Sequence, residues 1–257
     1  MKIVRYKDAA GGCAKYGIVE GTTVYAGEGN LFEGLTKGSI VGEYETLNVL
    51  APLEPGKVVA IGMNYLKHVR EVEPDREVPT EPVVFMKPTT AIVGPGAAIE
   101  LAYPENRTDY EAELAVVIGK TAYRVSEADA LDYVLGYTAA NDVSDRVQQL
   151  GGLQWIRGKG YNTYLPMGPV IETELDPGNA QVQSRLNGEP RQDDNSSGLI
   201  FNVPFLIQFL SDVMTLHPGD VILTGTPHNV GNVKAGDTIE VEVSGVGVLS
   251  NPVVNRV

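Results

Sequence analysis

The chain has 257 residues, a length that fits one large domain or two small ones. Hydrophobic residues make up 43% of it and charged residues 21%, a balance that is typical of globular proteins and excludes disordered and fibrous chains. The 33 Asp and Glu residues outnumber the 20 Lys and Arg residues, and no basic cluster interrupts this acidic excess. Because nucleic acids bind to positively charged surfaces, the chain is not expected to bind one.

The N-terminus and the single cysteine bear on the compartment in which the protein works. Residues 1–7 lack the apolar run of a signal peptide, and no stretch of the sequence approaches about 18 consecutive apolar residues. The single cysteine, Cys13, excludes an internal disulfide and a thiolate metal cluster. We therefore expect a cytoplasmic protein that does not bind a membrane.

Short strands separated by Gly and Pro turns are the elements expected through most of the chain. The stretch 52–56 contains two prolines and breaks any regular element, so it divides a small N-terminal β subdomain, 1–55, from a larger domain, 56–257. The expected strands are 2–6, 14–20, 22–26, 58–61, 83–86, 114–118, 170–172, 221–224 and 239–243.

Two helices are expected among these strands. Ser126 begins a capping sequence ahead of an apolar pattern that Gly136 would end, and apolar residues recur at helical spacing over 201–211. Many short strands with few helices indicate an α+β fold that is predominantly β. The sequence contains neither the glycine pattern of a dinucleotide site nor a phosphate-binding loop, so no nucleotide cofactor is expected.

Two glutamates, Glu111 and Glu113, precede a strand-forming apolar run. Residues two apart in an extended chain point to the same face, so these carboxylates are expected side by side. A buried pair is tolerated when one carboxyl is protonated, or when a cation such as Mg²⁺, Mn²⁺ or Ca²⁺ lies between the two. The alternative is a solvated strand face, which Glu240 and Glu242 illustrate later in the chain.

A third carboxylate and a histidine–glutamate pair are further candidates. Asp142 follows a run of small residues, 136–140, that is typical of a buried strand, and it is either a site residue or a turn cap. His68 and Glu71 would be neighbours on a helical turn, where they could act as a base and the carboxylate that orients it. The alternative is an exposed histidine with an incidental neighbour.

Lys159 and Thr226 lie in segments that contain glycine. Gly158 and Gly160 would let the backbone approach a ligand and hold the Lys159 ammonium over it, although a lysine on a surface loop is the alternative. In 223–227 a strand ends in a tight turn, where the Thr226 hydroxyl could hold a carboxylate or merely close the turn.

The order of these segments resembles the fumarylacetoacetate hydrolase superfamily from about residue 57 to the C-terminus. Each motif is weak alone, whereas their joint order and spacing are specific. The matching motifs are Asn64-Tyr65 with His68 and Glu71, Asp109-Tyr110-Glu111-Ala112-Glu113-Leu114, Gly136-Tyr137-Thr138 with Asn141-Asp142-Val143-Ser144, Arg146 and Gln149, Trp155 with Gly158-Lys159, Thr224-Gly225-Thr226-Pro227, and Gly236-Asp237.

The resemblance implies a mixed β-sandwich roll for the catalytic part and usually a homodimer. It also implies a divalent metal held by Glu111, Glu113 and Asp142. The metal is most often Mg²⁺, and Mn²⁺ or Ca²⁺ would accept the same oxygen ligands.

The implied substrate is a small 2-oxo acid or its enol. In the pattern of the family, Arg146, Gln149 and Thr226 lie around this substrate as binding residues. Lys159 would act in catalysis beside the metal. His68 and Glu71 match a catalytic dyad that is carried on a lid, for which the charged and proline-interrupted segment 66–81 is suited.

Three reactions are compatible with this site. Hydrolysis of an acylpyruvate or fumarylacetoacetate-type C–C bond is favoured over decarboxylation of oxaloacetate and over tautomerisation of a 2-hydroxyhepta-2,4-diene-1,7-dioate in aromatic catabolism. All three pass through an enolate that a divalent cation stabilises. Dehydration of sugar-derived 2-oxo acids is a further class, and a binding protein without turnover is the alternative to an enzyme.

The sequence departs from the commonest pattern of the family at two positions. Val147 stands where an Asp usually follows Arg146, and this change could loosen the orientation of the arginine. Asn162 stands where many members have an Asp, which would remove a charge close to the metal or to Lys159.

Overall fold

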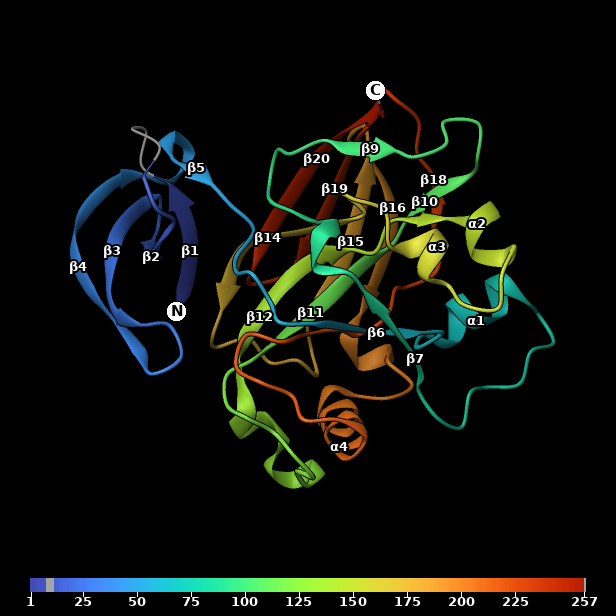
Figure 1. Cartoon of the computed structure of the whole chain (residues 1–257), viewed down its shortest axis with the longest axis horizontal. Coiled ribbons are helices and arrows are strands. Elements are labelled where there is room, and N and C mark those ends of the chain that lie inside the picture. The colour runs from blue at the N-terminus through green and yellow to red at the C-terminus, as the bar shows by residue number, and fades with distance from the viewer. Residues whose placement is uncertain (8–11, 257) are drawn as a thin grey trace.

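The computed structural model describes residues 1–7 and 12–256 (Figure 1). The described strands form sheets of twelve, five and three strands, and the helices between them are short. The α+β class with a predominance of strands is therefore confirmed. In the described residues, no helix is long and apolar enough to span a membrane.

The N-terminal strands curl away from the rest of the chain at the left of Figure 1, yet they belong to the large sheet. Strand β1 pairs with β14 of the larger part, where Ile3 lies opposite Ile171. The division of the chain at residue 55 stays a prediction. These strands are β1 (Lys2–Lys7), β2 (Lys15–Glu20), β3 (Thr23–Asn30), β4 (Gly34–Glu43) and β5 (Asn48–Val49).

The centre of the large sheet runs in the order β14, β12, β11, β17, β6, β7. All seven residues of β11 are buried, because the sheet is covered on both faces, and this explains its continuous apolar sequence. The strands are β6 (Val58–Gly62), β7 (Val83–Lys87), β8 (Ile92–Val93, beside β14), β11 (Ala112–Ile118), β12 (Val134–Asn141), β14 (Leu165–Glu172) and β17 (Val221–Leu223).

The five-stranded sheet packs against β11 and β12, and their apolar side chains share one core, as Leu114 and Val241 illustrate. The three-stranded sheet lies beside the point where β11 begins. In sheet order the strands are β16 (Glu189–Asn195), β15 (Gln181–Leu186), β19 (Thr238–Val243), β20 (Gly247–Asn255) and β9 (Ile99–Leu101), and then β13 (Ser144–Asp145), β10 (Thr108–Tyr110) and β18 (Gly231–Asn232).

The two expected helices have different outcomes. The helix predicted over 201–211 is α4, which begins after the cap residue Asn202 and packs against η3. The helix expected between Ser126 and Gly136 is confirmed at its start, where Ser126 is the cap, but it is the 3₁₀-helix η3, and it ends earlier than expected because β12 already begins at Val134.

The described helices are short, and the longest of them, α4, has 11 residues. They are α1 (Leu66–Val72), α2 (Arg146–Leu150), α3 (Ile156–Lys159), α4 (Val203–Val213), η1 (Tyr44–Thr46), η2 (Thr89–Ala91), η3 (Glu127–Tyr133) and η4 (Ser196–Gly198). Each expected strand overlaps one of the observed strands. The observed strands that were not expected are β4, β5, β8, β9, β10, β13, β15, β16, β18 and β20.

Candidate active site

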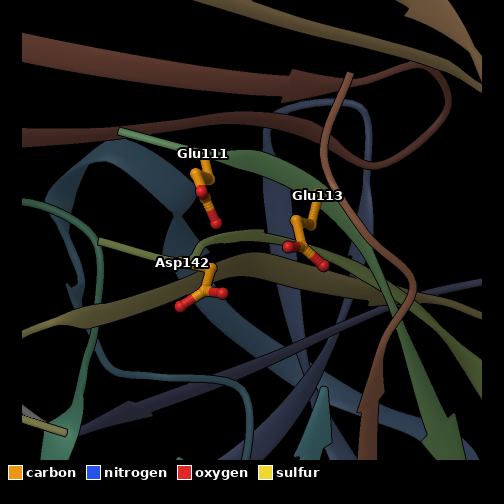
Figure 2. A group of neighbouring side chains, drawn as sticks. All are labelled: Glu111, Glu113 and Asp142. Atoms are coloured by element: carbon orange, nitrogen blue, oxygen red, sulfur yellow. The ribbon is translucent and has the colours of Figure 1, made fainter. Parts of the chain in front are cut away.

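Three carboxylates converge where β11 and β12 lie side by side, as Figure 2 shows. Glu113 is in β11, Glu111 lies between β10 and β11, and Asp142 directly follows β12. The backbone N–H of Asp142 donates to the carbonyl of Glu111, which fixes the two residues opposite each other. One ligand oxygen of each carboxylate lies within 4.8 Å of the others, and all three residues are buried. The solvated-face alternative for Glu111 and Glu113 is therefore wrong.

Two buried lysines and the half-buried Arg146 contact two of these carboxylates. The Lys159 ammonium lies 2.6 Å from both Glu111 Oε2 and Asp142 Oδ2. Lys87 Nζ lies 2.5 Å from Asp142 Oδ1, and Arg146 Nη2 donates to Glu111 Oε1 at 2.7 Å. Burial raises the pKa of Glu111, but the charges of Lys159 and Arg146 outweigh this effect and hold it well below its ordinary range.

Glu113 has a different environment. Within the described residues it forms no ion pair, and its Oε2 accepts a hydrogen bond of 2.7 Å from the backbone N–H of Gly225. Burial raises the pKa of Glu113 well above its ordinary range, and the charges of Asp142 and Glu111 raise it further. A divalent cation would relieve this repulsion, and three buried carboxylates are the oxygen ligands that hard cations prefer. The residues present thus fit a metal of this kind.

The turn at Gly225 requires glycine. Its φ is +103°, and a Cβ there would lie 2.8 Å from the Cβ of Asn64. The buried Asn64 side chain ties this turn to the start of α4, because its amide donates to the carbonyls of Thr224 and Phe201. The N–H that holds Glu113 is thereby fixed in place.

The three carboxylates line a cavity of about 770 Å³, and His68 and Glu71 of α1 line it as well. His68 Nδ1 lies 3.2 Å from Glu71 Oε2, so the other ring nitrogen is left for a ligand. Glu71 in turn accepts hydrogen bonds of 2.9 and 3.1 Å from the backbone N–H of Asn229. His68 is therefore buried and Glu71 is held by the backbone, so the pair is not an incidental surface contact.

Arg146 is held on three sides. Besides Glu111 it donates to Asp109 Oδ2 at 2.8 Å and to Gln149 Oε1 at 2.9 Å. The expectation that Val147 loosens this arginine is therefore wrong, because none of its contacts depends on residue 147. Val147 instead lines the cavity with an exposed side chain.

The Thr226 hydroxyl is held on two sides. It donates to the carbonyl of Ala112 at 2.9 Å and accepts from the amide of Gln192 at 2.8 Å. Gln192 lies in β16 and also accepts from the backbone N–H of Ala112 at 2.9 Å. The two sheets are thus joined by hydrogen bonds next to Glu113.

All nine residues expected in the site line this one cavity. The structure brings them together, and their individual roles stay predictions. Asn162 lines a separate pocket, beside Tyr161 and Arg256, and is not among the residues that line this cavity, so the charge effect expected at residue 162 stays a prediction.

Sequence reasoning missed Lys87, Asp109 and Gln192. Lys87 ends a strand whose residues at 83, 85 and 87 face inward, so a lysine at a buried position of that alternation was the available signal. Asp109 lay inside the Asp-Tyr-Glu-Ala-Glu motif but was given no role. Gln192 has no signal of its own in the sequence, because its partners come from β11 and from the turn after β17.

Several known proteins are similar to this chain in sequence and in fold. An oxaloacetate tautomerase of Xenopus laevis mitochondria is 42% identical over 221 residues, which are 81% of this chain and 69% of that protein. A 5-carboxymethyl-2-hydroxymuconate delta-isomerase of Mycobacterium smegmatis has a structure that matches with a TM-score of 0.89, 38% identity and full coverage of both chains. A maleylpyruvate hydrolase of Sphingobium, in complex with manganese(II) ion and pyruvate, matches at a TM-score of 0.81 with 28% identity and 99% coverage of both chains.

The model of the fumarylacetoacetate hydrolase C-terminal family matches residues 57–254, which hold every residue of the cavity described above. The mixed β-sandwich roll expected from the motifs is confirmed by the match to solved structures of this fold. With the family model spanning most of its length and relatives above 40% identity, this chain belongs to the fumarylacetoacetate hydrolase superfamily of enzymes.

Proposed function

We propose that this chain is a divalent-metal-dependent enzyme that acts on a small 2-oxo acid through its enol form. The observation that carries the proposal is the convergence of Glu111, Glu113 and Asp142 in one cavity with His68 and Lys159. When bound by the three carboxylates, Mg²⁺ or Mn²⁺ would supply Lewis-acid polarisation of the keto group. The Sphingobium relative, with its manganese ion and pyruvate, supports this assignment.

The residues around the three carboxylates would bind the substrate and stabilise charge. Lys159 adds a fixed positive charge where the enolate oxygen develops, in a site from which burial excludes most water. Gln149 and Thr226 line the same cavity. The Gln149 amide nitrogen would donate to the carboxylate of the substrate, whereas the Thr226 hydroxyl already donates to the carbonyl of Ala112 and would contact the substrate without donating to it. Arg146 donates hydrogen bonds to Glu111 and to Gln149, so it would orient the Gln149 side chain.

His68 is suited to move the proton. Glu71 holds its Nδ1, so Nε2 can take a proton from the carbon next to the keto group and return it elsewhere on the substrate. Such a transfer alone interconverts keto and enol forms or shifts a double bond. We place tautomerisation or isomerisation first, because relatives at 42% and 38% identity are named as a tautomerase and an isomerase. This reverses the order that the motifs alone favour.

Hydrolysis of an acylpyruvate-type C–C bond is the second candidate. Here His68 would instead deprotonate a water that attacks the second carbonyl group. The match to a maleylpyruvate hydrolase favours it. The same cavity would serve both reactions, and the decarboxylation of oxaloacetate as well.

The deciding experiment compares reactions on one preparation of the protein. The enol–keto conversion of oxaloacetate is followed by ultraviolet absorbance, and pyruvate release from acetylpyruvate and from oxaloacetate is followed in parallel, with Mg²⁺ or Mn²⁺ and then with a chelator. We expect metal-dependent conversion of oxaloacetate, and a loss of about 100-fold or more in His68→Gln. Pyruvate release from acetylpyruvate at a comparable rate would favour the hydrolase. Equal rates with and without the chelator would contradict the proposal.

A further inference from the structure

Helix α1, which carries His68 and Glu71, depends on the rest of the chain for its position. It has seven residues, and a helix of that length is not stable by itself in water. Its buried residues are His68 and Val69, and no side chain caps its N-terminus. The contacts that fix α1 therefore also fix the direction in which the His68 ring points.

Two hydrogen-bonded contacts join the side chains of α1 to distant parts of the described chain. Glu71 accepts from the N–H of Asn229, and Lys67 Nζ donates to Asp194 Oδ2 at 2.9 Å. Asp194 lies in β16 of the five-stranded sheet, so this contact joins α1 to the second sheet. Because Lys67 directly precedes His68, α1 is held next to the residue that would move the proton.

The carboxylate of Asp194 is itself oriented. Its Oδ1 accepts a hydrogen bond of 2.9 Å from the backbone N–H of Asn195, and only 16% of its side chain is exposed. Burial raises the pKa of Asp194, but the hydrogen bonds from Lys67 and from Asn195 outweigh this effect and lower it. Asp194 is therefore ionised at neutral pH and offers a fixed negative charge to α1.

Asp194 also faces the loop that holds Glu71. Its Oδ2 lies 3.7 Å from Nδ1 of His228, a buried atom that has no hydrogen-bond partner among the described residues. His228 directly precedes Asn229, whose N–H holds Glu71. One carboxylate of the second sheet thus lies against both segments that set the histidine–glutamate pair, which are α1 and this loop.

The strand β16 presents alternate residues to the site. Residues two apart in a strand point to the same face, so Gln192, which holds the turn after β17, and Asp194, which holds α1, lie on one face. Asp193 lies on the other face, where it is exposed and accepts hydrogen bonds from two glutamines of β15. It is a matched control, because it is the same residue type in the same strand.

We propose that Asp194 is a positioning residue for His68. By holding Lys67 and lying against His228, it fixes α1 and the loop, and so keeps Nε2 of the histidine turned to the cavity. This inference rests on the proposed function, in which His68 moves the proton. The ion pair with Lys67 contributes little to stability, because the lysine is largely exposed. Its effect is on the rate, since a displacement of about 1 Å can slow a reaction by about 100-fold.

The first measurement does not depend on turnover. The chain has three histidines, so NMR of protein labelled with ¹⁵N at histidine resolves the imidazole nitrogens of His68, His217 and His228, and single substitutions assign them. A carboxylate only accepts hydrogen bonds, so Glu71 holds His68 in the tautomer with its proton on Nδ1. In Asp194→Asn the His68 signals should shift toward those of mixed tautomers, whereas the exposed His217 should be unchanged.

The second measurement is a double-mutant cycle on the 2-oxo acid that the unchanged protein converts fastest. Asp194→Asn should lower kcat about tenfold and change KM by less than about twofold, because the three metal-binding carboxylates are untouched. In the His68→Gln background it should cause no further loss, since a residue that acts through His68 has no effect once His68 is gone. Lys67→Met should lower kcat by only about twofold, and Asp193→Asn should leave it unchanged.

The inference is overturned if Asp194→Asn leaves the His68 signals and kcat unchanged, if it lowers kcat by the same factor in His68→Gln, or if Asp193→Asn has the same effect. Asp194→Glu guards against a folding defect, because it retains the charge and should recover part of the lost kcat. Full activity of His68→Gln would overturn the proposed function together with this inference. A loss in His68→Gln but not in Asp194→Asn would overturn only the role of Asp194.

Discussion

At the buried end of the cavity, Glu111 and Asp142 are each held by two cations, and the lysines that hold them are themselves buried. At the open end, Val147 and Leu150 are exposed, and so are Arg76 and Arg107, with 40% and 60% of their side chains exposed. Groups that must stabilise charge are positioned before a ligand arrives, because positioning them during the reaction would cost free energy. Side chains that select a substrate can be exposed to solvent and still bind it, as long as their own contacts fix their orientation.

The two ends of the cavity also differ in which parts of the sequence form them. The buried end comes from β11 and β12, whose residues are fixed by pairing along their whole length. The open end comes from α1, α2 and the segment before β10, which meet only in the folded chain. Changes at the buried end are therefore expected to have larger effects than changes away from it.

Glu113→Gln is expected to cause the largest loss. It removes the one carboxylate of the three that has no ion pair in the described residues, so a cation would lose a ligand that no neighbouring charge replaces. Metal affinity and metal-dependent activity should each fall by at least about 100-fold. Calorimetry with Mn²⁺ and a steady-state assay would measure the two effects. Glu240→Gln is the matched control, because Glu240 belongs to the same Glu-x-Glu pattern but pairs with Arg185 outside the cavity.

Lys87→Met is expected to destabilise the protein mainly when metal is absent. Lys87 is fully buried against Asp142, and breaking a buried ion pair costs about 3–5 kcal/mol of unfolding free energy. A cation bound by the three carboxylates would offset part of this loss. The unfolding free energy lost in Lys87→Met should therefore be larger when denaturation is measured in a chelator than in excess Mg²⁺.

Lys57→Met provides the control for this difference. Lys57 pairs with the buried Asp220 away from the cavity. Lys57→Met should therefore lower the unfolding free energy by the same amount with and without metal. A loss in Lys87→Met that does not depend on metal would show that Lys87 is a structural residue only.

Much of the buried end could be predicted from local sequence, and the open end could not. Glu111 and Glu113 are two apart next to an apolar strand, and Asp142 ends the next strand, so period-2 alternation and one hairpin-like pairing suffice to bring them together. Lys87 reaches Asp142 from the edge strand β7 across 55 residues of sequence, and this contact depends on a sheet order that no short pattern encodes.

The helix expected after Ser126 shows a second limit. Its cap was predicted from local hydrogen bonding and is present, with the Ser126 side chain accepting from the N–H of Asp129. The element that follows is a 3₁₀-helix because β12 must begin at Val134 to pair with Ile118 of β11. Tertiary pairing thus overrides a correct local signal.

Gln192→Leu tests whether the second sheet positions the site. Gln192 donates to the Thr226 hydroxyl and to the carbonyl of Pro227, so its loss leaves that turn with fewer contacts. We expect KM for a 2-oxo acid to rise roughly tenfold, the worth of one net hydrogen bond, with a smaller change in kcat. Gln181→Leu removes a half-buried amide from the adjacent strand, outside the cavity, and should change neither constant.

Lys67→Met is expected to have the smallest effect and to depend on pH. Lys67 of α1 donates to Asp194 Oδ2 at 2.9 Å, and it is largely exposed. Burial raises the pKa of Asp194, but the hydrogen bonds from Lys67 and from the N–H of Asn195 outweigh it, so the pKa lies below its ordinary value.

A carboxyl with a lowered pKa in the folded state contributes stability above the unfolded pKa of about 3.9, and this contribution disappears as pH falls through the folded value. The stability difference between the unchanged protein and Lys67→Met should therefore be present at pH 7, at less than about 1 kcal/mol because the pair is solvated. It should vanish at an acid pH that lies below the folded pKa of Asp194. Urea denaturation at the two pH values measures it, and a difference that persists at the lower pH would mean that Lys67 stabilises α1 by packing and not by charge.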